Sequence, residues 1–320
     1  MKKILAHVLA LTMLVGLAAC GNSASSPGEQ AQYKVGICQL EQHTALDEAT
    51  EGFTDALREE LGDSVSFNIQ NAGGELSVCS SIVNQFLAEE VDLILANATP
   101  ALQAAAAATA DTPILGTSVT EYGVALELEG FNGTVGGNIS GTSDFAPLDA
   151  QAKMIADWFP EAESVALLYC SSEVNSQYQV EAIKAELEKL GYTAEYYSFS
   201  DSNDMAGVVE AAAAECDIIY VPTDNTVASC AAIIDNICRP IGKPVIGGES
   251  GMCEICSLAS LSIEYYDIGY TTGKMAARIL AGGEDISTMP IGYADYSAVY
   301  NADICAALGL TPPEGYEPLA

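Results

Sequence analysis

The sequence predicts an α/β protein of two doubly wound parallel-sheet lobes joined by a three-crossover hinge. Three observations predict it. Apolar strand-like runs alternate with helical stretches from Tyr33 onward, and the same alternation starts again at Glu163. Between the two sets lies SGTSDFAPLDAQ, a polar segment with the turn-rich composition of a crossover between domains. Strict alternation implies parallel strands with helices on both faces of each sheet.

The first set is predicted from short apolar runs bounded by turn formers and from longer stretches with helical periodicity. In chain order we expect a strand at 33–40 (YKVGICQL), a helix at 46–61, a strand at 64–72, a helix at 75–90, a strand at 91–98, an alanine-rich helix at 100–110 and a strand at 113–119. A turn-rich passage then ends in GFNGTVGGNIS at 130–140.

The second set repeats this pattern. We expect a strand at 163–171 (ESVALLYCS), a helix at 174–190, a strand at 192–199, a helix at 204–214, a strand at 216–223 (CDIIYVPT), a helix at 226–236 and a strand at 243–249. The chain would cross between the lobes near 140–144, 261–266 and 289–293, and the helical stretch 267–283 would pack back on the first lobe. The predicted N-terminal lobe is 33–141 plus 262–290, and the predicted C-terminal lobe is 142–261 plus 291–320.

The N-terminus has the layout of a bacterial lipoprotein signal. Lys2 and Lys3 precede an apolar stretch too short to span a membrane, which ends in the lipobox-like tetrapeptide LAAC. We therefore expect a signal peptide at 1–19, lipidation of Cys20 and a flexible tether at 20–32. The protein would be exported and anchored by lipid to the outer face of the cell membrane.

The charge of the chain argues against polyanionic partners. It has 11 Lys plus Arg against 44 Asp plus Glu, a net charge of -33, and loss of the signal lysines would leave -35. Such a surface repels nucleic acid.

The sequence has ten cysteines, which is many for a chain that would be exported into oxidising surroundings. Lipidation of one leaves an odd number, so at least one thiol would stay unpaired. Cys253 and Cys256 have CxxC spacing, but no second CxxC and no nearby histidine accompany them, so we expect a surface disulfide or two apolar thiols and no metal site. Cys38, Cys170 and Cys216 lie in or beside apolar runs and are expected to be buried.

Two doubly wound lobes create a cleft, and in such sheets ligands bind beyond the carboxyl ends of the strands. The polar residues at the predicted strand ends are therefore candidate ligand contacts: Gln39, Glu41, Asn71, Asn97, Thr99, Ser118, Thr120, Ser171, Asn175, Thr223, Asp224, Asn225 and Glu249. Each has an alternative role as a helix cap, because helix N-termini need side-chain acceptors. Asp224 could cap a helix from Thr226, and Ser143 or Asp144 could cap one near Pro147.

Enzymatic functions lack their usual motifs. The sequence has no GxGxxG after the first strand, no GxxxxGKS/T and no GxSxG, and its histidines are His7 and His43. His43 lines a pocket or is an exposed loop residue. The chain is thus predicted to be a monomeric solute-capturing receptor without a cofactor, which works by domain closure.

Five segments resemble, in order and spacing, the ABC-transporter substrate-binding lipoproteins typified by tryptophan and tyrosine binders. They are GICQLEQHTALDEATEGF, LILANATPALQAAA, ISGTSDFAPLDAQ, IIYVPTDNTVAS and IEYYDIGYTTGKMAARIL. The resemblance implies a type I periplasmic-binding-protein fold, an aromatic amino acid (Trp, Tyr or Phe) as ligand, and ABC permease and ATPase subunits as partners. A purine or a short peptide is the alternative ligand, and presentation of a bound solute to a membrane receptor is the alternative role.

The resemblance also implies a set of pocket residues. They are Gln39, Glu41, His43, Ala98, Thr99, Ser118, Thr120, Thr142, Ser143, Asp144, Asn175, Asp224 and Asn225, to which we add Glu249 from the adjoining cysteine-rich loop. Asp224 is expected to pair with the ligand ammonium, because an ammonium needs an anion. Hydroxyls, backbone N–H groups and helix N-termini near Thr99 and Thr120 would hold the ligand carboxylate, since Lys and Arg are scarce.

Overall fold

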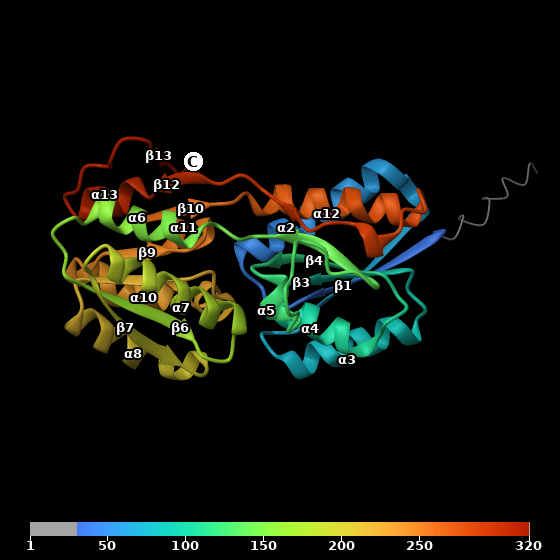
Figure 1. The fold of residues 1–320 in the computed structure, drawn as a ribbon, viewed down its shortest axis with the longest axis horizontal. Coiled ribbons are helices and arrows are strands. Elements are labelled where there is room, and N and C mark those ends of the chain that lie inside the picture. The colour runs from blue at the N-terminus through green and yellow to red at the C-terminus, as the bar shows by residue number, and fades with distance from the viewer. Residues whose placement is uncertain (1–30, 320) are drawn as a thin grey trace, which may run out of the picture. The chain divides into compact units, whose positions relative to one another are not determined.

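The computed structural model describes residues 31–319, which contain two predominantly parallel sheets with helices on both faces (Figure 1). The predicted signal peptide at 1–19, the lipidated Cys20 and nearly all of the tether lie outside the described residues. Within 31–319, no helix is both long and apolar enough to cross a bilayer.

The first lobe is built on a six-stranded sheet in the order β11-β5-β4-β3-β1-β2, with parallel pairing throughout. Its strands are β1 (Tyr33–Gln39), β2 (Val65–Asn71), β3 (Leu93–Asn97), β4 (Ile114–Val119), β5 (Ile139–Ser143) and β11 (Gly292–Tyr293). Its helices are α2 (Thr44–Leu61), α3 (Leu76–Ala88), α4 (Thr99–Ala108), α5 (Tyr122–Ala125) and α12 (Tyr265–Leu280), with 3-10 turns at Gly62–Ser64 and Ile286–Thr288. In Figure 1, α3 and α4 cover one face of the sheet, and α2 and α12 the other.

The second lobe is built on a seven-stranded sheet in the order β13-β12-β10-β9-β8-β6-β7. Its strands are β6 (Ser164–Cys170), β7 (Thr193–Phe199), β8 (Ile218–Val221), β9 (Val245–Gly247), β10 (Ala259–Ser262), β12 (Ser297–Tyr300) and β13 (Glu317–Pro318). Its helices are α6 (Leu148–Trp158), α7 (Val174–Lys189), α8 (Ser202–Glu215), α9 (Asn225–Ser229), α10 (Ala231–Cys238), α11 (Ser250–Ile255) and α13 (Ala302–Ala307), with a 3-10 turn at Arg239–Ile241. Only the β10–β12 pair of this sheet is antiparallel within the described residues.

The chain passes between the two sheets three times. It leaves the first sheet after Ser143, returns between Ser262 and Tyr265, and leaves again between Tyr293 and Ser297. The third passage therefore lies a few residues beyond the predicted 289–293, because Gly292 and Tyr293 pair with Thr142 and Ser143 at the sheet edge. The exact lobe boundaries stay a prediction.

Two local expectations were wrong. The predicted helix at 226–236 is two helices, α9 and α10, which meet at Cys230. The segment after Glu249, predicted to be a loop, contains helix α11, because the Glu249 carboxylate accepts hydrogen bonds from the backbone N–H groups of Gly251 and Met252 and caps it.

Helix α12 is held to the first lobe by unusually close backbone packing on α2. A Cβ atom at Gly269 would lie 2.0 Å from the carbonyl oxygen of Ala49, and one at Gly52 would lie 2.1 Å from that of Tyr266. Only glycine lets the two helices approach this closely. The helix that follows the second passage is thus docked firmly on the first lobe, as the sequence analysis expected.

Candidate functional site

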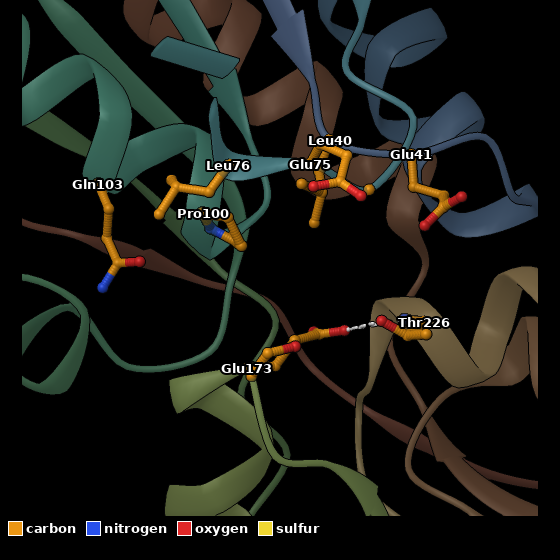
Figure 2. Close-up of a pocket in the computed structure, with 10 residues that line it drawn as sticks. Leu40, Glu41, Glu75, Leu76, Pro100, Gln103, Glu173 and Thr226 are labelled. Atoms are coloured by element: carbon orange, nitrogen blue, oxygen red, sulfur yellow. Dashed lines mark hydrogen bonds between the residues drawn. The ribbon is translucent and has the colours of Figure 1, made fainter. Parts of the chain in front are cut away.

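A cavity of about 240 Å³ lies between the lobes, beyond the carboxyl ends of β1 and β6. Figure 2 shows Glu41 and Glu75 on one side of it and Glu173 with Thr226 on the other. The lining residues are Leu40, Glu41, Gly74, Glu75, Leu76, Pro100 and Gln103 from the first lobe and Ser172, Glu173 and Thr226 from the second. Its volume is near the lower end of the range of ligand pockets, which suits one small solute.

Three carboxylates give this cavity its electrostatic character. Glu41, Glu75 and Glu173 line it, and no Lys or Arg is among the described residues that do so. Burial raises the pKa of Glu41, and the negative charge of Glu173 across the cavity raises it further. The cavity therefore favours a ligand that brings a positive charge.

Glu173 joins two helix N-termini on the second lobe. It lies directly before α7, and its carboxylate accepts hydrogen bonds from the backbone N–H and side chain of Asn225 and from the backbone N–H and hydroxyl of Thr226 at the start of α9. Glu173 is only 5% exposed. The sequence analysis missed this residue, although an acid three residues after the end of β6, directly before a predicted helix, was the signal that could have found it.

His43 contacts the second lobe. Its Nε2 lies 3.4 Å from Oδ1 of Asn225, and burial lowers the pKa of the imidazole despite nearby acidic residues. A second cavity, of about 150 Å³, lies beside this contact and is lined by Gln42, His43, Thr44, Ala228, Ser229, Glu249, Gly251 and Ile255. Of the two alternatives for His43, the structure shows the residue at the rim of a cavity.

Asp224 is buried and is not among the residues that line the cavity. It is 1% exposed, and its oxygens accept hydrogen bonds from the backbone N–H groups of Val227 and Cys170, at 2.9 and 2.7 Å. Asp224 therefore makes the helix cap that the sequence analysis gave as the alternative role. Burial and the neighbouring Glu173 raise its pKa well above the ordinary value.

A second group of predicted residues gathers at the carboxyl ends of β4 and β5. The Ser143 hydroxyl donates to the carbonyl of Thr120, and it accepts from the backbone N–H of Phe145. Asp144 accepts a 2.9 Å hydrogen bond from the hydroxyl of Tyr265, at the first residue of α12. Asp144 thus joins the first and second passages between the lobes, and burial raises its pKa.

Four buried polar atoms of the predicted residues have no hydrogen-bond partner among the described residues. They are Oδ1 of Asn97, the Ser118 hydroxyl, Oδ1 of Asp144 and Oδ1 of Asn175. Buried polar groups in proteins are nearly always paired, with protein, water or ligand. A water or a bound molecule could pair with these atoms.

Two of the predicted residues have left-handed backbone conformations. Ala98, directly before α4, has φ +91°, and Ser118, near the end of β4, has φ +53°. Such conformations are strained in residues other than glycine and concentrate at functional sites. They bend the chain at the strand ends, where the first lobe presents its loops.

Other predicted residues are buried, and some of their side chains contact other groups of the protein. The Gln39 side chain donates to the Glu41 carbonyl and the Asp47 carboxylate. The Thr142 hydroxyl lies 2.7 Å from that of Thr272 on α12, inside the first lobe. Thr99, 2% exposed, is the first residue of α4. In this structure these three side chains support the site from within.

Comparison with known proteins gives the family. The family described as ABC transporter substrate binding protein matches residues 34–316. The chain belongs to this family. It is a solute-binding protein and not an enzyme, and the predicted type I periplasmic-binding-protein fold is confirmed.

Individual relatives agree over nearly the whole chain. A tyrosine-binding protein of Clostridioides difficile is 33% identical over 96% of this chain and 91% of its own length. A Streptococcus pneumoniae ABC domain in complex with L-Trp is 34% identical, with a TM-score of 0.84 over 88% of this chain and 96% of that one. A ligand-free, open substrate binding protein with adhesive properties from Clostridium difficile is 37% identical, with a TM-score of 0.68 over 90% and 99%.

Proposed function

We propose that this protein captures an aromatic amino acid (Trp, Tyr or Phe) between its lobes and delivers it to an ABC importer. The observation that carries the proposal is the cavity between the lobes, lined by apolar side chains and by carboxylates from both lobes. An amino acid with an apolar body and an ammonium group matches both features.

The two ends of such a ligand need different partners. A carboxylate would hold the ligand ammonium. Asp224 is the partner predicted from the sequence, and Glu173, which lines the cavity, is the second candidate. The ligand carboxylate would be held by hydroxyls and backbone N–H groups, and the N-terminus of α4, whose Pro100 lines the cavity, adds a partial positive charge. The unpartnered hydroxyl of Ser118 is a further donor.

The relatives support the ligand class. One is a tyrosine-binding protein and another is in complex with L-Trp, both at more than 30% identity. The chain also has a higher TM-score with the L-Trp complex than with the ligand-free, open structure, although the open protein has the higher identity. This difference is the one expected if capture depends on closure of the lobes.

The remaining parts of the proposal concern location and assembly. The protein would act as a monomer outside the cytoplasm, tethered through a lipid on Cys20, and would hand its ligand to permease and ATPase subunits. The site would comprise the predicted pocket residues, with Glu173 added. Metabolic labelling with a fatty acid, lost in Cys20→Ala, tests the anchor.

Ligand binding is tested by thermal unfolding of residues 33–320 with each of the twenty amino acids, with purine nucleosides and with short peptides. A ligand that binds only the folded state raises the melting temperature, by roughly 5 °C at a hundredfold excess over Kd for a chain of this size. We expect a rise with Trp, Tyr or Phe and none with Ile or Ala. No rise with any aromatic amino acid would contradict the ligand class.

A further inference from the structure

Cys38 and Cys79 lie on facing surfaces inside the first lobe. Cys38 is the residue before last of β1, and Cys79 is in the first turns of α3; both are fully buried, in one apolar core. The buried residues of α3 are Cys79, Ile82, Val83 and Phe86, the spacing of one helix face. This face packs on β1.

Gly36 fixes how the helix sits over the strand. A Cβ atom at Gly36 would lie 2.5 Å from the ring of Phe86, so Phe86 covers Gly36. Side chains alternate along a strand, and therefore Cys38 points to the same face as Gly36, about 7 Å further along.

The helix runs in the opposite direction to the strand, because α3 connects the parallel strands β2 and β3 and passes over β1, which lies between them. Cys79 lies two helical turns before Phe86, about 10 Å along the axis of α3. The Phe86 ring leans toward the helix N-terminus and takes up part of this length, which leaves Cys79 over Cys38.

The two thiols are free in this structure, and each shifts the pKa of the other. A side-chain hydrogen bond between them raises the pKa of Cys38, which burial raises further, and lowers the pKa of Cys79. Cys79 lies near the N-terminus of α3, where a thiolate is also favoured.

We propose that Cys38 and Cys79 form a disulfide that fastens the start of α3 to the end of β1. Cys38 is followed by Gln39 and Leu40, and Cys79 comes one helical turn after Leu76. Leu40 and Leu76 both line the cavity between the lobes. The bond would thus fix the distance between two walls of the cavity.

The oxidant is a low-molecular-weight disulfide such as oxidised glutathione. The Cys79 thiolate attacks one sulfur of this disulfide, releases one thiolate and forms a mixed disulfide. The deprotonated Cys38 thiol then attacks Sγ of Cys79 and releases the second thiolate, so two protein thiols lose two protons and two electrons while one disulfide becomes two thiols. Because both residues are buried, the reaction occurs while the chain folds, before α3 docks on β1.

The full chain is refolded in a mixture of oxidised and reduced glutathione, its remaining thiols are blocked with N-ethylmaleimide, and it is digested without reductant. Mass spectrometry is expected to find one peptide pair linked through Cys38 and Cys79, which separates on reduction. The proposal is overturned if both residues carry the label, or if they are linked to other cysteines instead.

A second measurement addresses the consequence of the bond. Thermal unfolding of the oxidised protein with and without dithiothreitol is compared among the wild type, Cys79→Ala and Cys230→Ser, whose thiol is half-buried and belongs to the second lobe. Reductant is expected to lower the melting temperature of the wild type and of Cys230→Ser by several degrees and to leave Cys79→Ala unchanged. An equal fall in all three, or no fall in any, contradicts the proposal.

Discussion

The imidazole Nε2 of His43 in the first lobe lies 3.4 Å from the amide oxygen of Asn225 in the second. His43 lines the smaller of the two cavities between the lobes, and Thr226, the residue after Asn225, lines the larger. The amide oxygen is an acceptor, so the contact requires a proton on Nε2 of the imidazole. Burial lowers the pKa of the imidazole and so favours its neutral form.

This burial predicts that acid destabilises the protein through His43. The lowered pKa means that the folded chain binds fewer protons than the unfolded chain below about pH 6.5, so the free energy of unfolding falls as pH falls through the folded pKa. His7 belongs to the predicted signal peptide, so His43 is the sole imidazole of residues 33–320. Proton NMR of that fragment is expected to give a titration midpoint below 6.5; a midpoint at or above it would show that burial does not dominate.

Glu249 predicts a pH dependence of the opposite sign. Burial raises its pKa from 4.5 to about 7, so the folded chain binds more protons than the unfolded chain between these values, and stability falls as pH rises from 4.5 to 7. The loss is about 3 kcal/mol. Urea unfolding across this range is expected to show a steeper slope in His43→Gln, which removes the opposing contribution, than in His43→Gln with Glu249→Gln, in which the other buried carboxyls with raised pKa values remain. The same slope in both variants would exclude Glu249 as its source.

Asp224→Asn tests the predicted partner of the ligand ammonium. We expect ligand affinity to fall tenfold or more, since a hydrogen bond to a charged group contributes about 1.5–3 kcal/mol. The free energy of unfolding should also fall by about 1–3 kcal/mol. The backbone N–H groups of Cys170 and Val227 both donate to Asp224, and in the variant one of them faces the NH₂ group of Asn. Calorimetric titration at a temperature where both proteins are folded separates the two effects. Unchanged affinity in Asp224→Asn, together with a fall in Glu173→Gln, would transfer the role to Glu173.

Ser118→Ala separates binding from stability. The Ser118 hydroxyl is buried and has no partner within residues 31–319, so its removal should raise the free energy of unfolding of the ligand-free protein by about 1 kcal/mol. If a ligand supplies the missing partner, the same change lowers affinity about fivefold to tenfold. Higher stability with unchanged affinity would place Ser118 outside the ligand contacts.

Gly269→Ala tests the docking of α12 on α2. The new methyl group would meet the Ala49 carbonyl, so the helices must separate, at a cost of about 1–3 kcal/mol. Gly207→Ala is the matched control, because Gly207 is an exposed position in α8 with nothing within 4 Å of its Cβ site, and alanine should stabilise it by up to about 1 kcal/mol. Chemical denaturation measures both; equal effects would show that the contact between α2 and α12 carries no strain.

Much of the fold could be predicted, because alternation of strand and helix is a local property of the chain. Runs such as LILAN and VALLYC predicted buried strands, which β3 and β6 confirm, and α7 begins at the predicted residue. One error concerns a contact between distant parts of the chain, because nothing local shows that Ile139–Ser143 joins the first sheet between β4 and β11. The other is local, because Glu249 caps α11 through the N–H groups of Gly251 and Met252, and the sequence analysis did not recognise this cap.

The sequence by itself determined the alternating fold class and the burial of Cys38, Cys170 and Cys216. It also determined that few Lys and Arg side chains are available to bind a ligand. The tertiary structure decided which side chains meet: Glu173 with the start of α9 and Asp144 with Tyr265. It also placed Cys38 and Cys79 in one buried core. The physical reason is that periodicity shows which face of an element is buried, whereas the residue opposite depends on how elements far apart in the chain pack. The same reason placed Glu41 and Glu173 across one cavity, from different lobes.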